Sequence, residues 1–208
     1  MFTANLLLFL PAAIALIIAP GPDSLYVLAR GIGQGRRAGV ISAFGTCTGL
    51  LVHTTAAALG LAVLLQTSVI AYLVVKFAGA TYLLYLGVRT LLTKQSFSIT
   101  TAATRPSVAR MYLQGMLTNV LNPKVALFFV AFLPQFVDQR SGMVALQMLT
   151  LGLLFAGLGL LYLLLVAALS GSLGALLQRR PAWANRLRWM TGSVLIGLGL
   201  RLAIPDRR

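Results

Sequence analysis

The chain has 208 residues, of which 59% are hydrophobic and 10% are charged. Soluble domains carry about 25% charged residues, so this composition excludes a soluble globular protein and indicates a polytopic membrane protein. The formal net charge is +14, but the basic residues separate apolar runs, which favours cytoplasmic loops at a lipid surface over nucleic-acid binding. The single cysteine, Cys47, excludes an internal disulfide and any CxxC motif, and we predict no metal site and no cofactor.

Helix breakers interrupt the first apolar run, which extends from about Thr3 to beyond Ala29. The segment Pro20-Gly21-Pro22-Asp23 lies inside this run. Proline lacks the backbone N–H and clashes with the preceding helical turn, so the helix must break here. In lipid the freed backbone groups need partners, and a broken span is tolerated only where it faces protein or a watery cavity.

Two further spans and a linker follow. Residues 38–75 carry no fixed charge and are too numerous for one crossing of about 20 residues. Gln66-Thr67-Ser68 is the expected turn between the second and third spans, and the third span continues to Arg89. Residues 93–110 are rich in Ser and Thr, so we predict a cytoplasmic linker there.

The second half contains another interrupted run. The fourth span is expected over residues 111–137, with Asn122-Pro123-Lys124 inside it. The fifth span is expected to end near Leu169. Residues 170–188 are rich in arginine, which predicts an interfacial loop. The sixth span is expected over about residues 189–204, and its ends are the least well defined. The predicted fold is therefore all-α, with six transmembrane helices of which the first and fourth are broken.

The distribution of basic residues predicts the orientation. With the N-terminus outside, the inner loops hold Arg30, Arg36, Arg37, Arg89, Lys94, Arg105, Arg110, Arg179, Arg180, Arg186 and Arg188. The outer side holds only Arg140, Arg201, Arg207 and Arg208. This bias places both chain ends outside the cytoplasm. Lys76 and Lys124 remain within the membrane, and Lys76 and Arg89, near span ends, are expected to snorkel.

Similar residues recur at a fixed spacing. Lys76-Phe77, Leu83, Leu86-Gly87 and Arg89 recur as Arg188-Trp189, Leu195, Leu198-Gly199 and Arg201, each 112 positions later, and Pro22-Asp23 recurs as Pro123-Lys124. Because each half holds three spans, the second copy enters the membrane from the opposite side. The pattern predicts an inverted repeat with halves at 1–92 and 111–208. Two interrupted helices in matching positions are typical of a transporter binding site.

Several motifs together resemble the LysE/RhtB-type amino-acid exporter family. They are Pro20-Gly21-Pro22-Asp23, Gly33-Gln34-Gly35-Arg36-Arg37-Ala38-Gly39, and Asn122-Pro123-Lys124 followed by Phe132-Leu133-Pro134-Gln135-Phe136. The resemblance extends over nearly the whole chain. It implies a bacterial inner-membrane exporter of amino acids or close derivatives, driven by the proton-motive force. It leaves the substrate open, because members differ among lysine, threonine, homoserine, leucine and cysteine.

The two breaks predict a pair of half-helix starts inside the membrane. Asn122 is a good N-cap and Pro123 suits the first helical position, and Gly21 and Pro22 fill the same roles in the first break. A helix N-terminus favours an anion, so Asp23 fits its position, whereas Lys124 does not. An intramembrane lysine needs a partner, which is either Asp23 across the repeat interface or a substrate carboxylate. A purely structural ion pair that locks the two halves is the alternative.

Other polar side chains on the spans are weaker candidates. Ser42, Thr46, Gly49 and His53 share one face of the second span and would line a cavity, although Gly45 and Gly49 fit helix packing better. A lone histidine such as His53 is more often a hydrogen-bonded structural residue than a proton carrier. Gln114 and Asn119 on the fourth span are further candidate donors. We expect Thr46, His53 and Asn119 to govern side-chain selectivity.

The leading hypothesis is a secondary transporter that exports amino acids, by proton antiport through Asp23. The substrate carboxylate would meet Lys124 and the free N–H groups after Pro123, and its ammonium would be placed toward Asp23. The expected partners are the amino acid, protons and the lipid bilayer. The alternatives are a non-transporting membrane scaffold subunit and an intramembrane enzyme, although an enzyme would need a paired catalytic constellation that the sequence lacks. Proton stoichiometry, homo-oligomer formation and the titration of His53 stay open.

Overall fold

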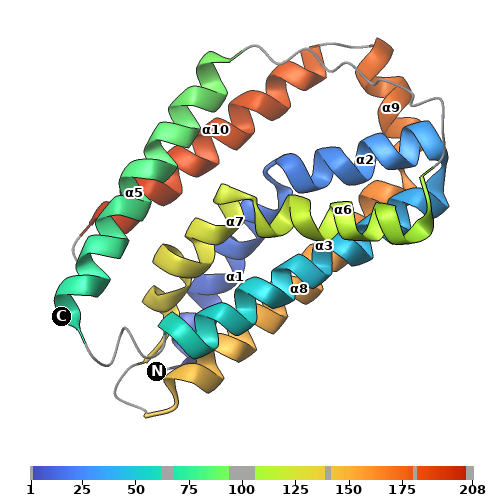
Figure 1. Ribbon diagram of the computed structural model, residues 1–208. Helices are drawn as coiled ribbons and strands as arrows, with labels where there is room; N and C mark the ends of the chain where they lie inside the picture. Colours follow the sequence, from blue (N-terminus) through green and yellow to red (C-terminus); the bar gives the residue numbers. More distant parts are fainter. Residues whose placement is uncertain (1, 62–67, 94–105, 139–141, 180–181, 205–208) are drawn as a thin grey trace.

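The fold is helical throughout the part of the chain that the structure describes (Figure 1). A computed structural model describes residues 2–61, 68–93, 106–138, 142–179 and 182–204. Its helices are α1 (Phe2–Ile18), α2 (Pro22–Gln34), α3 (Arg36–Ala56), η1 (Ala57–Leu61), α5 (Val69–Leu92), α6 (Val108–Val120), α7 (Pro123–Leu127), η2 (Phe128–Phe132), η3 (Leu133–Phe136), α8 (Val144–Ala168), α9 (Ser170–Arg179) and α10 (Ala182–Ala203). The all-α prediction is confirmed. Of the expected turn at Gln66-Thr67-Ser68, the first two residues lie outside the described ranges, and Ser68 is the N-cap of α5.

Several helices are long and apolar enough to cross a membrane. Among the described residues these are α3 with the start of η1, α5 and α8, and the bent pairs α1–α2 and α6–α7 with its continuation would supply two more spans. Each pair bends by 47° at its break. The expected sixth span corresponds to α10, which has 22 residues but carries Arg186, Arg188 and Arg201. Its role as a crossing stays a prediction.

Both breaks begin a new helix as the sequence predicts. At the first break, Ser24 Oγ accepts from the Gly21 amide at 3.0 Å and donates to the Gly21 carbonyl at 3.1 Å. At the second break, Asn122 Oδ1 accepts from the Lys124 amide at 3.0 Å, and Pro123 is the first residue of α7. These side chains satisfy backbone groups that a helix start leaves free, which is why the breaks are tolerated inside an apolar protein.

An aromatic core lies beside the second break. The helix after Lys124 loosens into a π-helix and tightens into a 3₁₀-helix, and it buries Phe128, Phe129 and Phe132. Phe128 stacks on Phe155 of α8 with ring centroids 4.5 Å apart, and Phe9 of α1 meets the Phe136 ring edge-on at 5.4 Å. These rings join α1, α8 and the segment that follows α7.

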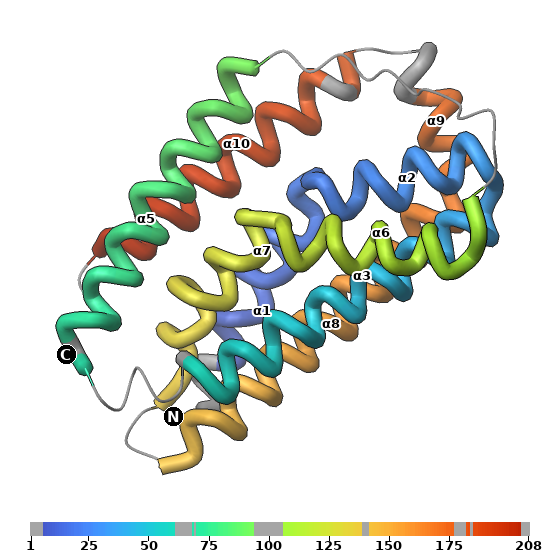
Figure 2. The backbone as a smooth tube through the Cα atoms, viewed as in Figure 1, coloured from blue at the N-terminus to red at the C-terminus, as the bar shows by residue number. Residues whose placement is uncertain are grey.

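Helices α5 and α10 form an antiparallel pair set beside the remaining helices (Figures 1 and 2). Glycines bring their backbones together. A Cβ on Gly87 would lie 2.9 Å from the Gly192 carbonyl, and a Cβ on Gly199 would lie 3.1 Å from the Ala80 carbonyl. The two contacts are related by the spacing of 112 residues seen in the sequence, since Gly199 corresponds to Gly87 and Gly192 to Ala80. The spacing of 112 residues thus recurs in the packing of this one helix pair, and the repeat of the two halves stays a prediction.

Several predictions about the polar residues and segments differ from the structure. Residues 170–188, expected as a loop, contain α9, and α10 begins at Ala182, seven positions before the predicted start at Trp189. The segment is rich in Ala and Leu, which are strong helix formers, and its arginines are compatible with an amphipathic helix at the interface. Lys76 does not snorkel: it is 2% exposed and donates to the Ile204 carbonyl at 3.5 Å, near the end of α10. In addition, α6 begins at Val108, within the expected linker.

Candidate functional site

Asp23 lies where the two broken helices cross. It is in the first turn of α2, and its Oδ2 accepts the amide of Asn119 and the amide of Asn122, each at 2.9 Å. Asn119 belongs to the last turn of α6, where free carbonyls would repel a carboxylate. The two asparagine amides therefore allow a negative group to sit against the unfavourable end of that helix.

Lys124 does not pair directly with Asp23 in the structure. Its Nζ donates to the Leu16 carbonyl at 3.1 Å and to the Ala19 carbonyl at 2.8 Å. These carbonyls lie at the C-terminal end of α1, where a helix leaves acceptors free and its dipole favours a cation. The lysine that looked misplaced at the start of α7 is thus well placed at the end of α1. Of the two partners that the sequence suggested, Asp23 therefore forms no direct ion pair with Lys124 among the described residues, and the substrate carboxylate stays a prediction.

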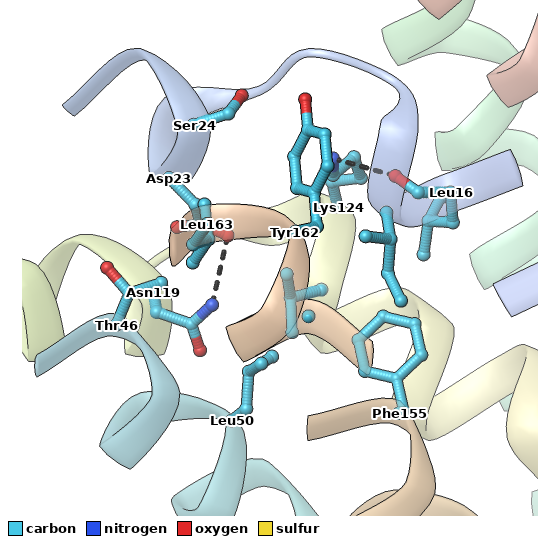
Figure 3. Close-up of a pocket in the computed structure, with 13 residues that line it drawn as sticks. Leu16, Asp23, Ser24, Thr46, Leu50, Asn119, Lys124, Phe155, Tyr162 and Leu163 are labelled. Atoms are coloured by element: carbon cyan, nitrogen blue, oxygen red, sulfur yellow. Dashed lines mark hydrogen bonds between the residues drawn. The ribbon is translucent and has the colours of Figure 1, made fainter. Parts of the chain in front are cut away.

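One oxygen of Asp23 is left without a hydrogen-bond partner. Oδ1 is shielded from the surface and has no bonding partner among the described residues, and the same is true of Asn119 Oδ1. Asp23 and Asn119 line a small cavity of about 30 Å³ (Figure 3). A buried water needs roughly 10–15 Å³ of such space, so the cavity has room for one or two waters. Tyr162 of α8 and Lys124 belong to the same lining.

A second, larger cavity lies on the other side of the crossing. It measures about 300 Å³, and its lining includes the first break, the second break, and polar residues of the α5–α10 pair. Those polar residues are Arg89, Thr90, Thr93 and Thr191. Lys124 lines both cavities, whereas Asp23 lines only the small one. The two breaks, joined by the hydrogen bond from Asn122 to Asp23, therefore separate the cavity of about 30 Å³ from the cavity of about 300 Å³.

The face of α3 that was predicted to line a cavity does so only at Thr46, and its other residues pack against neighbouring helices. Thr46 is fully buried, lines the small cavity, and lies 3.5 Å from the Gly115 carbonyl. Gly49 packs against Asn119, so the helix-packing interpretation holds there. His53 lines neither cavity: its Nε2 lies 3.2 Å from the Asn119 carbonyl, and its ring stacks on Phe129 at 5.7 Å.

The remaining predicted residues gather at the breaks. Gly21 packs so closely on Lys124 that a Cβ there would lie 2.9 Å from Nζ. Pro22, Asn122 and Pro123 line the large cavity. Gln114 is the exception, because it accepts from Arg30 at 2.5 Å and so joins α6 to the C-terminal half of α2.

Sequence reasoning missed several contributors to these cavities, among them residues of α8 and α10. Tyr162 and Phe155 lie on α8, and Thr191 lies on α10, where its hydroxyl is 3.3 Å from the Pro20 carbonyl. A single tyrosine or threonine in an apolar helix carries no distinctive spacing, so no local signal identifies them. Arg89, which was expected to snorkel, is exposed and also lines the large cavity.

A model of the family described as LysE type translocator matches residues 14–205 of this chain. The chain belongs to the LysE type translocator family. This match includes both breaks and confirms the resemblance that the motifs suggested. Membership also makes the chain a multi-pass protein of the bacterial inner membrane.

Several relatives are similar to this LysE type translocator over nearly their whole length. The membrane protein YrhP of Bacillus subtilis (strain 168) is 31% identical over 215 residues, which cover 96% of this chain and 99% of the relative. A membrane protein of Vibrio cholerae serotype O1 is 29% identical, with 95% of each chain covered. The leucine efflux protein of Klebsiella pneumoniae is 29% identical over 96% of this chain and 94% of its own. No solved structure matches the chain.

Proposed function

We propose that this protein exports amino acids from the cytoplasm in exchange for protons, and that Asp23 is the group that binds the proton. The observation that carries the proposal is the half-satisfied Asp23 carboxylate. One oxygen accepts two amides, while the other, shielded and without a partner, borders a water-sized cavity. An intramembrane carboxylate with one oxygen that accepts no hydrogen bond is a site for a proton or for a substrate ammonium. The leucine efflux protein among the relatives supports the amino-acid substrate.

Competition for Asp23 Oδ1 would couple the two fluxes. A proton and an α-ammonium cannot both occupy one oxygen, so release of one favours binding of the other. The substrate carboxylate would be drawn to Lys124, which a shift of α1 relative to α7 would free from the Leu16 and Ala19 carbonyls. Lys124 would then exchange its carbonyl partners, and Asp23 its proton, for groups common to all amino acids.

The sizes of the two cavities are consistent with a conformation closed on the Asp23 side. Pockets that hold small organic ligands measure roughly 300–1,000 Å³. The large cavity, at about 300 Å³, reaches the lower end of this range, whereas the cavity of about 30 Å³ does not. In this proposal the inverted halves 1–92 and 111–208 rock against each other, so that each cavity widens in turn.

A non-transporting scaffold subunit is the weaker alternative. A scaffold needs only packed helices, whereas Asp23 is an intramembrane carboxylate whose Oδ1 borders a cavity, and such groups are functional more often than structural. An intramembrane enzyme would require a catalytic pair. Asp23 and Asp138 are the only carboxylates among the described residues, and Asp138 bonds through its backbone to Gln147 at the start of α8.

The test is uptake of radiolabelled amino acids into inside-out membrane vesicles with an imposed pH gradient. Asp23→Asn keeps an oxygen that can accept the asparagine amides but cannot exchange a proton, so gradient-driven uptake should fall to background while the protein stays folded in the membrane. Asp138→Asn is the matched control and should retain uptake. Unchanged gradient-driven uptake by Asp23→Asn would remove this residue from proton coupling, and an inactive wild-type protein with every amino acid would refute export.

A further inference from the structure

We infer that the large cavity is a separate capture site on the cytoplasmic side, in which Arg89 binds the carboxylate of an amino acid that has an uncharged, aliphatic side chain. The inference rests on the proposed export function and adds a subsite to it. The substrate would bind here before it reaches Asp23 and Lys124.

The position of the cavity indicates on which side of the membrane it opens. Its walls run from the two breaks, at the middle of the bundle, to Arg89, Thr90 and Thr93 at the C-terminal end of α5. That end precedes the segment predicted to be cytoplasmic from its basic residues. Figure 1 shows the same end of α5 beside the beginning of α10, away from the aromatic core. The cavity therefore leads from the cytoplasmic ends of α5 and α10 toward Lys124.

The charge of the lining selects an anionic group. Arg89 and Lys124 are its two cations, and no carboxylate belongs to its described lining, because Asp23 faces the cavity on the opposite side of the crossing. Arg89 is exposed and Lys124 is 7% exposed and held by carbonyls, so Arg89 is the cation free to meet an incoming ligand first. An arginine presents a planar fork of donors that matches a carboxylate.

Hydroxyl oxygens in the same lining complete the recognition of a zwitterion. Thr90 donates its proton to the Leu86 carbonyl at 2.7 Å, and Thr191 is 2.9 Å from the Leu187 carbonyl. Their protons are used within the protein, so the oxygen atoms remain as acceptors for an α-ammonium group. The cavity thus offers donors for the carboxylate and acceptors for the ammonium.

The apolar part of the lining determines the side chain that fits. Leu25, Leu86 and Leu195 contribute from three different helices, α2, α5 and α10. An aliphatic side chain would be buried against them. A lysine or arginine side chain would bring a third cation into a space whose described lining holds two cations and no acid, which is unfavourable.

The test measures transport kinetics in inside-out vesicles, which expose the cytoplasmic face to the added substrate. For Arg89→Gln, the KM for leucine should rise about tenfold or more, the factor of a lost charge-assisted hydrogen bond, with little change in the maximal rate. Arg89→Lys should recover part of the affinity. Arg37→Gln, at the exposed start of α3 and outside both cavities, is the matched control and should behave like the wild type.

A ligand without the carboxylate separates direct binding from an indirect effect. In the wild type, leucinamide should inhibit the uptake of radiolabelled leucine much more weakly than unlabelled leucine does. The ratio of the two inhibition constants should be about tenfold smaller in Arg89→Gln. An unchanged KM in Arg89→Gln, an undiminished difference for leucinamide, or equal wild-type uptake of lysine and leucine would overturn the inference. If the protein did not export amino acids at all, the wild type and the Arg37→Gln control would also show no uptake. That result would distinguish failure of the proposed function from failure of the inference about Arg89.

Discussion

The environment of Lys124 depends on tertiary contacts more than on its position in the chain. By its position in the chain it is a cation at the start of α7, where the helix dipole disfavours it. Its side chain reaches the C-terminal carbonyls of α1 and donates to two of them. Lys76 acts in the same way on the Ile204 carbonyl near the end of α10. Both intramembrane lysines thus satisfy the end of another helix.

Replacing Lys124 should affect both stability and transport. Lys124→Met leaves the Leu16 and Ala19 carbonyls without this donor, so we expect the free energy of unfolding to fall by about 1.5–3 kcal/mol. Transport per folded molecule should be lost for every amino acid, because the carboxylate is common to all of them. The measurements are thermal unfolding in detergent and uptake normalised to folded protein.

Lys76→Met is the control for that variant, because Lys76 also donates to a carbonyl near a helix end but lines neither cavity. It should be destabilised and yet transport normally per folded molecule. Normal transport by Lys124→Met at equal folded amounts would contradict a role in substrate binding.

Exchanging the two charged residues should not restore the protein. In the double variant Asp23→Lys with Lys124→Asp, a carboxylate would face the Leu16 and Ala19 carbonyls, and a lysine would face the amides of Asn119 and Asn122. Both contacts would be repulsive, so we expect the double variant to be less stable than either single variant by thermal unfolding. A stable, active double variant would show instead that Asp23 and Lys124 form a simple ion pair.

At the scale of the helices, glycines determine how closely the spans approach. On α3 and α6, a Cβ at Gly45 would overlap the Tyr112 carbonyl, and one at Gly115 would lie 2.6 Å from the Ser42 carbonyl. Such contacts are typical of membrane helices, which associate through small residues. They also hold Thr46 and Asn119 beside the small cavity.

A methyl group at Gly45 should separate these helices. Because the obstacle is backbone and cannot rotate away, Gly45→Ala should lower the free energy of unfolding by about 1–3 kcal/mol or more. Gly157→Ala on α8 is the control, since a Cβ there meets nothing within 4 Å, and it should raise stability by up to about 1 kcal/mol through helix propensity. Thermal unfolding of both variants in one detergent makes the comparison. Equal melting temperatures would contradict the close packing of α3 on α6.

For the molecule as a whole, the distribution of basic residues predicts that both chain ends are outside the cytoplasm. The α5–α10 pair, with its glycine contacts related by 112 residues, is consistent with two halves of opposite orientation. A reporter that is active only in the cytoplasm should therefore be silent when fused after residue 208, and active when fused within the linker at residues 93–110. A bright C-terminal fusion would overturn the six-span topology and, with it, the inverted repeat.

The sequence by itself determined the features that depend on local chemistry. Proline, glycine and asparagine act on their own backbone or on the next turn, so the two breaks, the cap at Asn122 and the starts at Pro22 and Pro123 were predictable. Apolar runs between charged segments likewise defined an all-α membrane protein. The family motifs added the transporter class.

Only the tertiary structure decided which polar groups meet across the bundle. The partners of Asp23 lie 96 and 99 positions away in the chain, and those of Lys124 lie 108 and 105 positions away. Nothing local encodes such pairs, because they depend on how bent helices cross. The same reason explains why His53 shares a helix face with Thr46 yet lines no cavity, and why Arg89 faces a cavity that the sequence did not indicate. A helix face is a property of the sequence, but what lies opposite to it depends on packing.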